Sequence, residues 1–385
     1  MSEKRGEGLR AYFDNSSTTP VCAPAMEKIR EMMEETYGNP SSLHEMGIFA
    51  ELELKKARKI IADEAGCEPS EIMFCSGGSE ANNTALFGAA VKTRPLGDHI
   101  ITTAVEHMSV LEPLKRLENQ GASVEYLPPL EDGTFSADAI VQAAGDKTVL
   151  VSVMLCNNET GAVLPVKEAV RALRKKAPKA IIHCDAVQAF CKMPVDVKDL
   201  DADLVSFSAH KLHGPKGIGA LYIKKGLLLP PLILGGPQEN GRRAGTENTP
   251  HVAGFGIAVR EMASLDKSLI IKMKNQIISG LEAIPGAVVN SPREALPFII
   301  NFSVPGIRSE IMLHFLERRG IYVSSASACS KNRRSHVLMA QKLPQELLDS
   351  ALRVSLSRMN TPGECDYFLE TLEFAAKTLR NHRGA

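Results

Sequence analysis

The sequence lacks an excess of charge of either sign, since Lys plus Arg and Asp plus Glu each number 45 among its 385 residues. It therefore has no basic field with which to attract nucleic acid or an anionic membrane, and we expect neither as a partner. Little net charge also means little repulsion against self-association. Hydrophobic content of 44% and charged content of 23% are typical of an ordinary globular protein, long enough for one large and one smaller domain.

Long apolar runs and paired cysteines are also missing. No run reaches the length of a membrane span, and the charged segment Met1–Glu7 lacks the apolar region of a signal peptide. The eight cysteines are scattered and none forms a Cys-x-x-Cys pair, which argues against a zinc site or a disulfide framework. We therefore expect a cytoplasmic protein with reduced thiols and no metal site.

The sequence shows no repeat, but residues 70–225 alternate between apolar strand patterns and helical patterns. Strands are expected over 71–75, 99–102, 123–127, 148–155, 180–184, 204–207 and 219–223, and helices between them over 79–91, 109–119 and 166–176. Near-continuous Val and Ile runs alternating with helices indicate an α/β fold whose mostly parallel sheet is covered on both faces. Ligands of such sheets bind outside the carboxyl ends of the strands.

The remaining third of the chain predicts a smaller α+β unit. A long helical stretch over 250–283 leads out of the large domain. Strands are expected over 286–290, 298–302 and 321–324, and helices over 309–319, 345–350 and 362–380. We expect a large domain over residues 16–260 and a small domain made of residues 1–15 and 261–385, with the N-terminal arm packed on the small domain.

Lys211 is the most informative residue, because an apolar strand precedes it and a Gly/Pro turn follows it. Such a context can desolvate one amine, lower its pKa and allow it to form a Schiff base. Asp185 ends another apolar run and can pair with a protonated pyridine nitrogen. Alone, the lysine could be a surface charge and the aspartate a helix cap. Together they indicate pyridoxal phosphate chemistry.

Two further segments follow predicted strands. Small residues in 75–83, including Gly78 and Ser79, can bring backbone N–H groups to a phosphate at a helix N-terminus. The alternative is a plain strand-to-helix turn with Ser79 as N-cap. His107 follows another strand and could stack on a pyridine ring and later move protons as a catalytic residue, although an isolated histidine is more often structural.

Polar residues farther along the chain could bind anions. Asn157 and Asn158 end a strand, where they could form a turn or present an amide to a substrate carboxylate. The loop 242–248 suits an anion, a dimer interface or both. Arg353 lies in a strand-like stretch, where it could grip a carboxylate with two parallel hydrogen bonds or form a structural salt bridge.

Cys329 has different surroundings from the other cysteines. Small polar residues precede it and the basic cluster Lys331-Asn332-Arg333-Arg334 follows it. Positive charge near an exposed thiol favours the thiolate, which is the nucleophilic form. The alternative is an incidental surface cysteine. We expect Cys329 to be a nucleophile.

These motifs together resemble the cysteine desulfurases, the NifS/IscS-like branch of the class V aminotransferases. The resemblance extends from Tyr12-Phe13-Asp14-Asn15-Ser16 to the Arg353 stretch. Its most specific parts are Ser208-Ala209-His210-Lys211 and Arg243-Ala244-Gly245-Thr246, and Ser327-Ala328-Cys329 separates desulfurases from other members. It implies the fold type I of pyridoxal phosphate-dependent transferases.

The resemblance also implies a role for each site residue. Lys211 would hold pyridoxal phosphate and shuttle the α-proton, and Cys329 would attack the sulfur of L-cysteine to leave L-alanine and a persulfide. The other cofactor ligands would be Gly78, Ser79, His107, Asp185, Gln188, Ser208, His210 and, from the neighbouring subunit of a homodimer, Thr246. Asn158 and Arg353 would bind the substrate carboxylate.

The resemblance leaves the sulfur acceptor open. An Fe–S scaffold protein is the family default, and a tRNA-thiolation or thiamin partner is the alternative. The loop after Cys329 is slightly shorter than in IscS-type members, longer than expected for the SufS-type branch, and basic. Other readings are a selenocysteine lyase, an aminotransferase, or a catalytically silent binding subunit that keeps the fold.

Overall fold

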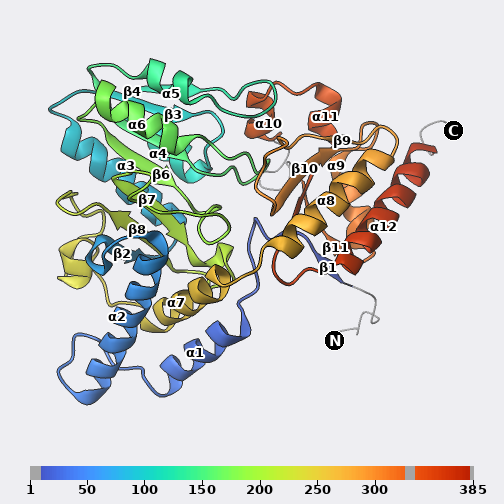
Figure 1. Cartoon of the computed structure of the whole chain (residues 1–385). Helices are drawn as coiled ribbons and strands as arrows, with labels where there is room; N and C mark the ends of the chain where they lie inside the picture. Colours follow the sequence, from blue (N-terminus) through green and yellow to red (C-terminus); the bar gives the residue numbers. More distant parts are fainter. Residues whose placement is uncertain (1–9, 326–333, 382–385) are drawn as a thin grey trace.

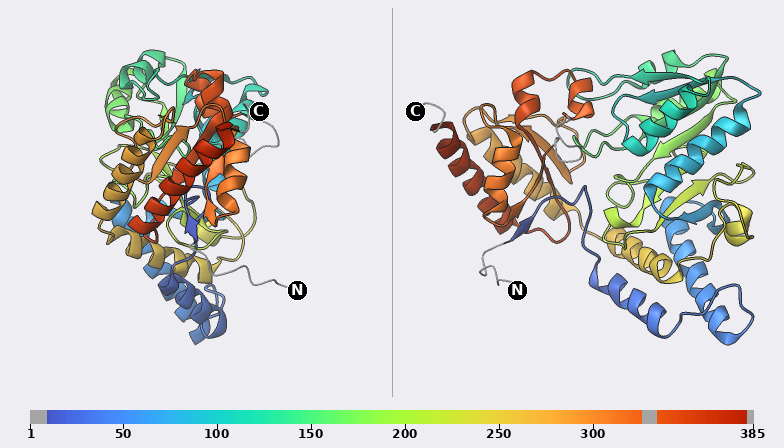
Figure 2. Two further views of the ribbon diagram at one scale, coloured as in Figure 1. Left: turned by 90° about the vertical axis from the view of Figure 1, so that its right-hand side faces the viewer. Right: turned by 180° about the vertical axis from the view of Figure 1, so that it is seen from behind.

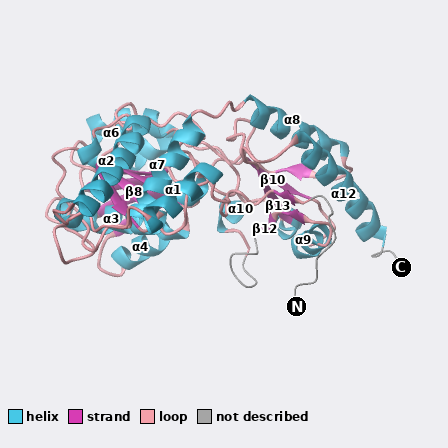
Figure 3. Cartoon of the chain, turned by 90° about the horizontal axis from the view of Figure 1, so that it is seen from below, coloured by secondary structure: helices cyan, strands magenta, loops and turns pink. Residues whose placement is uncertain are grey.

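A computed structural model describes residues 10–325 and 334–381. In these residues a larger lobe built on a seven-stranded sheet lies beside a smaller lobe built on a four-stranded sheet (Figures 1 and 3). The chain crosses between the lobes in its N-terminal arm and again between helices α7 (Thr249–Ala263) and α8 (Ser268–Ala283) (Figure 1). Among the described helices, none combines the length and apolarity needed to span a bilayer.

The large sheet confirms the predicted mostly parallel arrangement. Its strands lie in the order β2 (Ile72–Cys75), β8 (Gly219–Ile223), β7 (Leu204–Ser208), β6 (Ile181–Asp185), β5 (Thr148–Met154), β3 (His99–Thr103) and β4 (Ser123–Leu127). Strand β8 runs antiparallel to both of its neighbours, β2 and β7, and every other neighbouring pair in this sheet is parallel. Because β8 follows β7 after a short turn with no crossover helix, it returns in the opposite direction.

Helices cover both faces of this sheet, so its strands are apolar throughout. In β2, Met73 packs in one core cluster and Phe74 in another, and Ile181 and Ile182 of β6 divide in the same way. One face is covered by α3 (Gly78–Thr93) and α4 (Met108–Glu118), and the other by α2 (Glu45–Ala65), α6 (Val166–Lys176) and α7 (Thr249–Ala263). Each fully buried aliphatic side chain contributes about 1.5–3 kcal/mol. The lobe also contains α1 (Ala23–Glu34) and α5 (Ala137–Ala143).

The helical stretch expected over 250–283 consists of two helices. Helix α7 ends at Ala263 and α8 begins at Ser268. Between them, Asp266 accepts hydrogen bonds from the backbone N–H of Ser268 (2.9 Å) and from its hydroxyl (2.8 Å). A short acidic side chain bound to the backbone two residues onward favours a turn over a continuous helix, and the chain passes to the smaller lobe here (Figure 2).

The smaller lobe is the predicted α+β unit. Its antiparallel strands lie in the order β12 (Ser324–Ser325), β13 (Ala351–Ser355), β10 (Ile299–Ser303) and β9 (Val288–Val289). Its helices are α8 (Ser268–Ala283), α9 (Ser309–Glu317), α10 (His336–Ala340), α11 (Gln345–Ser350) and α12 (Pro362–Asn381).

The N-terminal arm packs on the smaller lobe, as predicted. Strand β1 (Ala11–Tyr12) pairs in parallel with β11 (Ile321–Tyr322), and Asp14 forms a bridge with Ser355. The strand expected over 321–324 is therefore divided, because β11 pairs with the arm while β12 pairs with β13. The exact domain boundaries, after residues 15 and 260, stay a prediction.

Candidate active site

Most of the predicted site residues lie at one edge of the large sheet. Asp185 is the last residue of β6 and Ser208 the last of β7, while His107 follows β3 and Asn158 follows β5. These strands run in parallel, so their carboxyl ends meet at the same edge. The location agrees with the general position of ligand sites in such sheets.

Lys211 is held by two backbone carbonyls of the N-terminal arm. Its Nζ donates to the oxygens of Ser16 (2.6 Å) and Ser17 (2.8 Å). Burial, followed by the charges of Lys192 and Arg353, lowers the pKa of Lys211 to about 7. Much of the amine is therefore unprotonated at neutral pH, which is the form that attacks an aldehyde.

Asp185 is a buried carboxylate with fixed hydrogen-bond partners. Its Oδ1 accepts from the backbone N–H of Val187 (3.0 Å) and its Oδ2 from Nδ2 of Asn82 (2.7 Å). Nδ2 of Asn82 also donates to Oγ of Ser109 (2.8 Å). These contacts fix the direction of the carboxylate. Neither Asn82 nor Ser109 was among the predicted site residues.

His107 caps helix α4 with its ring. Nδ1 accepts from the backbone N–H of Ser109 (3.1 Å) and lies 2.7 Å from the hydroxyl of the same residue. Because Nδ1 accepts, the proton of the neutral ring is on Nε2. Although His107 remains exposed to solvent, desolvation by the surrounding protein lowers its pKa, and the opposing effect of Asp185 does not offset it. A neutral ring suits stacking on a flat cofactor. Through Ser109 it is linked to Asn82 and Asp185.

A cleft of about 440 Å³ lies beside these residues and is lined by Gly78, Ser79, Ser208 and His210, among others. Oγ of Ser208 is buried and has no hydrogen-bond partner among the residues described. Helix α3 begins at this cleft, so its first N–H groups can bind an anion. Gly77 caps the helix and no side chain does, so the interpretation of Ser79 as an N-cap is wrong.

The two other predicted phosphate ligands, His210 and Thr246, line different clefts. Nδ1 of His210 lies 3.2 Å from the hydroxyl of Thr18, and burial, followed by the charge of Lys211, lowers the pKa of His210 to about 4. Thr246 is exposed and lines a second cleft, which shares Ser76 and Gly217 with the first.

Arg353 lies 7% exposed on β13, and its guanidinium is already partly bound. Nη1 donates to the carbonyl of Asn158 (2.8 Å), and Nη2 donates to Oδ1 of Asp14 (2.8 Å) and Oγ of Ser17 (2.7 Å). Its Nε–H is buried without a partner in the described part of the chain. The structural salt bridge therefore exists, and a donor remains for a further acceptor.

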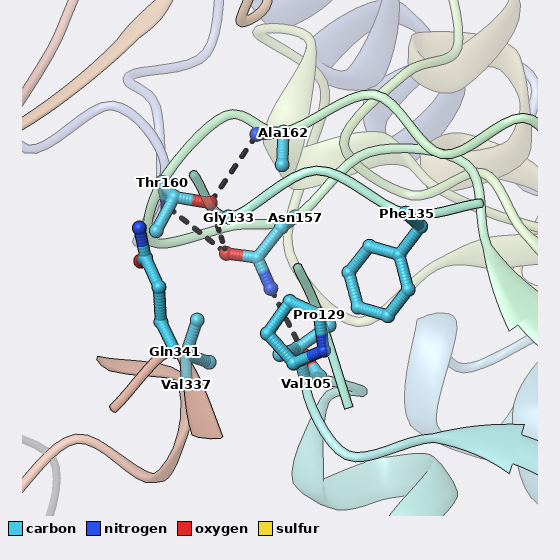
Figure 4. A pocket seen from close by; sticks show the side chains of 9 residues that line it. All are labelled: Val105, Pro129, Gly133, Phe135, Asn157, Thr160, Ala162, Val337 and Gln341. Carbon is cyan, nitrogen blue, oxygen red and sulfur yellow. Dashed lines mark hydrogen bonds between the residues drawn. The ribbon is translucent and has the colours of Figure 1, made fainter. Parts of the chain in front are cut away.

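The two neighbouring asparagines have different roles. Nδ2 of Asn157 donates to the carbonyl of Val105 (2.9 Å), and its Oδ1 accepts from the N–H group of Thr160 (Figure 4). The same Oδ1 accepts from the N–H group of Glu159. Asn157 is thus the turn residue. The turn also needs Gly161, whose φ is +74°. No hydrogen bond of the Asn158 side chain is found in residues 10–325 and 334–381, which leaves its amide available.

Gln188 lies 5% exposed near Lys211. Its Nε2 donates to the carbonyl of Ser16 (3.0 Å), which also accepts from Lys211. Its Oε1 accepts from Nζ of Lys192 (3.1 Å). Lys192 was not among the predicted site residues.

Cys329 lies outside the described residues. On one side of its segment, Ser324 pairs with Arg353 across β12 and β13. On the other side, Oγ of Ser335 donates to Oε2 of Glu159 (2.5 Å). The described chain therefore enters this segment beside Arg353 and leaves it beside Glu159, the residue after Asn158.

The seven described cysteines are all buried and free. Burial raises the pKa of Cys75 and of Cys156 to about 12, so neither is a thiolate at neutral pH. The described residues contain no group of three side chains suited to hold a metal ion.

The sequence profile described as aminotransferase class-V matches residues 11–368. This chain belongs to that family. A class-V relative named cysteine desulfurase IscS, from Methanosarcina thermophila, is 42% identical over 382 residues, which cover 97% of this chain and 94% of the relative.

Solved structures of similar proteins share the fold. A structure titled NifS-like protein has a TM-score of 0.90 and 39% identity, and the match covers 96% of this chain and all of that chain. A second, titled SspA in complex with cysteine, has a TM-score of 0.81 and 35% identity over 90% of this chain and 98% of that chain. The predicted class-V fold and family are thus confirmed.

Proposed function

We propose that this chain is a cysteine desulfurase, which removes the sulfur of L-cysteine, releases L-alanine and holds the sulfur as a persulfide on Cys329. The observation that carries the proposal is the amine of Lys211, whose pKa is lowered to about 7 at the edge where Asp185 ends β6. The names of similar proteins favour this activity over that of a selenocysteine lyase or an aminotransferase.

The residues of the site fit pyridoxal phosphate. The partnerless hydroxyl of Ser208 and the start of α3 provide donors for a phosphate, with Ser79 and His210 beside them. Asp185 provides a fixed acceptor for a protonated ring nitrogen, and Gln188 an amide for the ring oxygen. When bound, pyridoxal phosphate would accept the electron pair that remains on the α-carbon after its proton leaves.

Side chains around this site would bind and orient the substrate. Arg353 and Asn158 would hold the carboxylate of L-cysteine, since a buried guanidinium N–H and a side-chain amide remain available there. Lys211 would take the α-proton, and the neutral ring of His107 would cover one face of the cofactor. Cys329 would attack the sulfur as a thiolate.

We infer that the active unit is a homodimer. Thr246 is exposed on its own chain and would donate to the phosphate bound by the partner. Leu228 and Leu234, which are 77% and 81% exposed, provide apolar surface in the segment that precedes the Thr246 loop. Size-exclusion chromatography with light scattering would give twice the chain mass of 41.7 kDa. A monomer would contradict the inference.

The partner that receives sulfur would be an Fe–S scaffold protein, or a protein of tRNA thiolation or thiamin synthesis. The choice among these and the cytoplasmic location both stay predictions. The basic residues that follow Cys329 in the sequence favour an acceptor with an acidic docking surface.

One assay tests the activity. Purified protein with pyridoxal phosphate, L-cysteine and a reductant is expected to release alanine and sulfide in equal amounts. Cys329→Ala should abolish sulfide release, whereas Cys22→Ala, which removes a buried cysteine of a separate cluster, should keep it. Sulfide release by Cys329→Ala at the rate of the unmodified protein would overturn the proposal. Consumption of L-cysteine with neither alanine nor sulfide released would indicate an aminotransferase-like reaction instead, because that reaction removes the amino group and keeps the C–S bond.

A further inference from the structure

Lys192 is a buried lysine without an acidic partner. It is 6% exposed, and no acid of the described residues lies within ion-pair distance of its Nζ. The residue before it, Cys191, has a φ of +60°, which is unusual for a side chain with a Cβ. Burial lowers the pKa of Lys192 to about 8. A buried amine without an acidic partner and a backbone with positive φ both cost free energy, and we infer that this position serves the site.

The amine of Lys192 has one side-chain hydrogen bond, and it leads to the site. Nζ donates to Oε1 of Gln188 over 3.1 Å. It also lies 5.8 Å from the ring centroid of Phe298, in the range of a weak cation–π contact. Phe298 precedes β10, so Lys192 lies where the two lobes meet.

This contact decides which end of the Gln188 amide faces the site. An ammonium group has donors only, so the atom of Gln188 beside it must be the oxygen. The NH₂ group then faces the other way, where Nε2 donates to the carbonyl of Ser16 over 3.0 Å. The same carbonyl accepts from the amine of Lys211 over 2.6 Å.

We propose that Lys192 is a positioning residue, which holds the amide of Gln188 with its NH₂ group toward the ring oxygen of the cofactor. The proposal rests on the proposed function, because it needs a cofactor beside Lys211. Without Lys192 the amide could rotate and present its oxygen to that ring oxygen, and two acceptors would then face each other. Lys192 would thus act on cofactor binding through Gln188, in addition to the effect of its charge on the pKa of Lys211.

The test is the affinity for pyridoxal phosphate, measured on the cofactor-free protein by the change in cofactor absorbance. Lys192→Met keeps the length of the side chain and removes its donors, and we expect the dissociation constant to rise about tenfold. The control is Lys274→Met. Lys274 is also buried, 8% exposed, but its amine binds the carbonyl of Ala295 in the smaller lobe. This control should lower thermal stability and leave the affinity unchanged.

A double-mutant cycle separates positioning from a general structural effect. If Lys192 acts mainly through Gln188, then Lys192→Met should weaken binding much less in a protein that already carries Gln188→Ala than in the unmodified protein. Lys192→Arg keeps hydrogen-bond donors, so its dissociation constant for the cofactor should stay closer to that of the unmodified protein. It takes the place of Lys192→Met in the test if the methionine variant does not fold. Independent, multiplicative effects of the two substitutions, or unchanged binding by Lys192→Met, would overturn the proposal. Failure of the unmodified protein to bind the cofactor would instead refute the proposed function itself.

Discussion

Asp14 and Arg353 form an ion pair, with Oδ1 of Asp14 2.8 Å from Nη2 of Arg353, although 338 residues lie between them in the chain. The pair joins the N-terminal arm to β13 of the smaller lobe. It also orients a buried guanidinium beside Lys211. Both partners therefore affect the site, in different ways.

Replacing Arg353 by lysine should weaken substrate binding. A lysine retains the charge but lacks the Nε–H of Arg353, which is the donor that remains for a carboxylate. The loss of one charge-assisted hydrogen bond corresponds to about a tenfold to hundredfold increase in KM for L-cysteine. Steady-state kinetics measure it, and the absorbance of bound cofactor should not change. An unchanged KM would show that Arg353 does not contact the substrate.

Asp14→Asn should lower stability more than most surface substitutions. The variant leaves the positive charge of Arg353 buried near Lys211 and Lys192 without its carboxylate, which we expect to cost about 2 kcal/mol. Urea unfolding followed by circular dichroism measures the change. The matched control is Asp63→Asn, because Asp63 pairs with Lys59 on an exposed face of α2 and should contribute little. Equal effects of the two variants would contradict the prediction.

The rate at which pyridoxal phosphate attaches to the cofactor-free protein should depend on the ionisation of Lys211. The pKa of Lys211 is lowered to about 7, and the unprotonated amine is the reactive form. The rate should therefore rise with pH through about 7 and level off above 8, well below the range of an ordinary lysine. Stopped-flow absorbance from pH 5.5 to 9.5 measures it. Lys211→Ala should show no attachment, and a rate that still rises above pH 9 would contradict the lowered pKa.

Glu106 should make stability depend on pH. Burial raises its pKa from an ordinary value of 4.5 to about 8, and one of its carboxyl oxygens has no partner in the described residues. The folded chain then binds a proton that the unfolded chain releases above pH 4.5. The stability that the protonated Glu106 contributes to the folded chain is fully present below pH 4.5 and is lost as the pH rises through about 8. Over this range the free energy of unfolding falls by at most about 1.4 kcal/mol per pH unit.

Glu106→Gln should remove that slope, because glutamine does not titrate. Chemical unfolding at pH 6 and pH 8.5 measures the difference for both proteins. The hydrogen bonds that Glu106 accepts from Thr103 and Met154 can still form with the amide oxygen. A slope of the same size in the variant would show that another group is responsible.

The elements with the clearest boundaries were predicted best from the sequence. The strands over 123–127 and 219–223 and the helix over 166–176 agree with the structure at both ends. Turn residues such as Gly121, with a φ of +97°, interrupt the apolar pattern there. The helical stretch over 250–283 was harder, since only the hydrogen bonds of Asp266 reveal its break.

The site was predicted where the residues follow strands and was missed where contacts are distant in sequence. Lys211, Asp185 and His107 follow apolar runs that any reader of the sequence can find. Asn82 meets Asp185 across 103 residues, and no local pattern signals that contact. Lys192 was missed for a different reason, because a single lysine in a helix-and-turn region resembles a surface charge.

The N-terminal arm connects the two lobes at the amine of Lys211. Its Ala11–Tyr12 strand is part of the smaller lobe, yet the carbonyls of Ser16 and Ser17, a few residues later, hold the amine of Lys211 in the larger one. Rotation of one lobe against the other would therefore displace these two carbonyls relative to the amine. The stretch from Tyr12 to Ser17 thus couples the position of the smaller lobe to the contacts of the lysine amine.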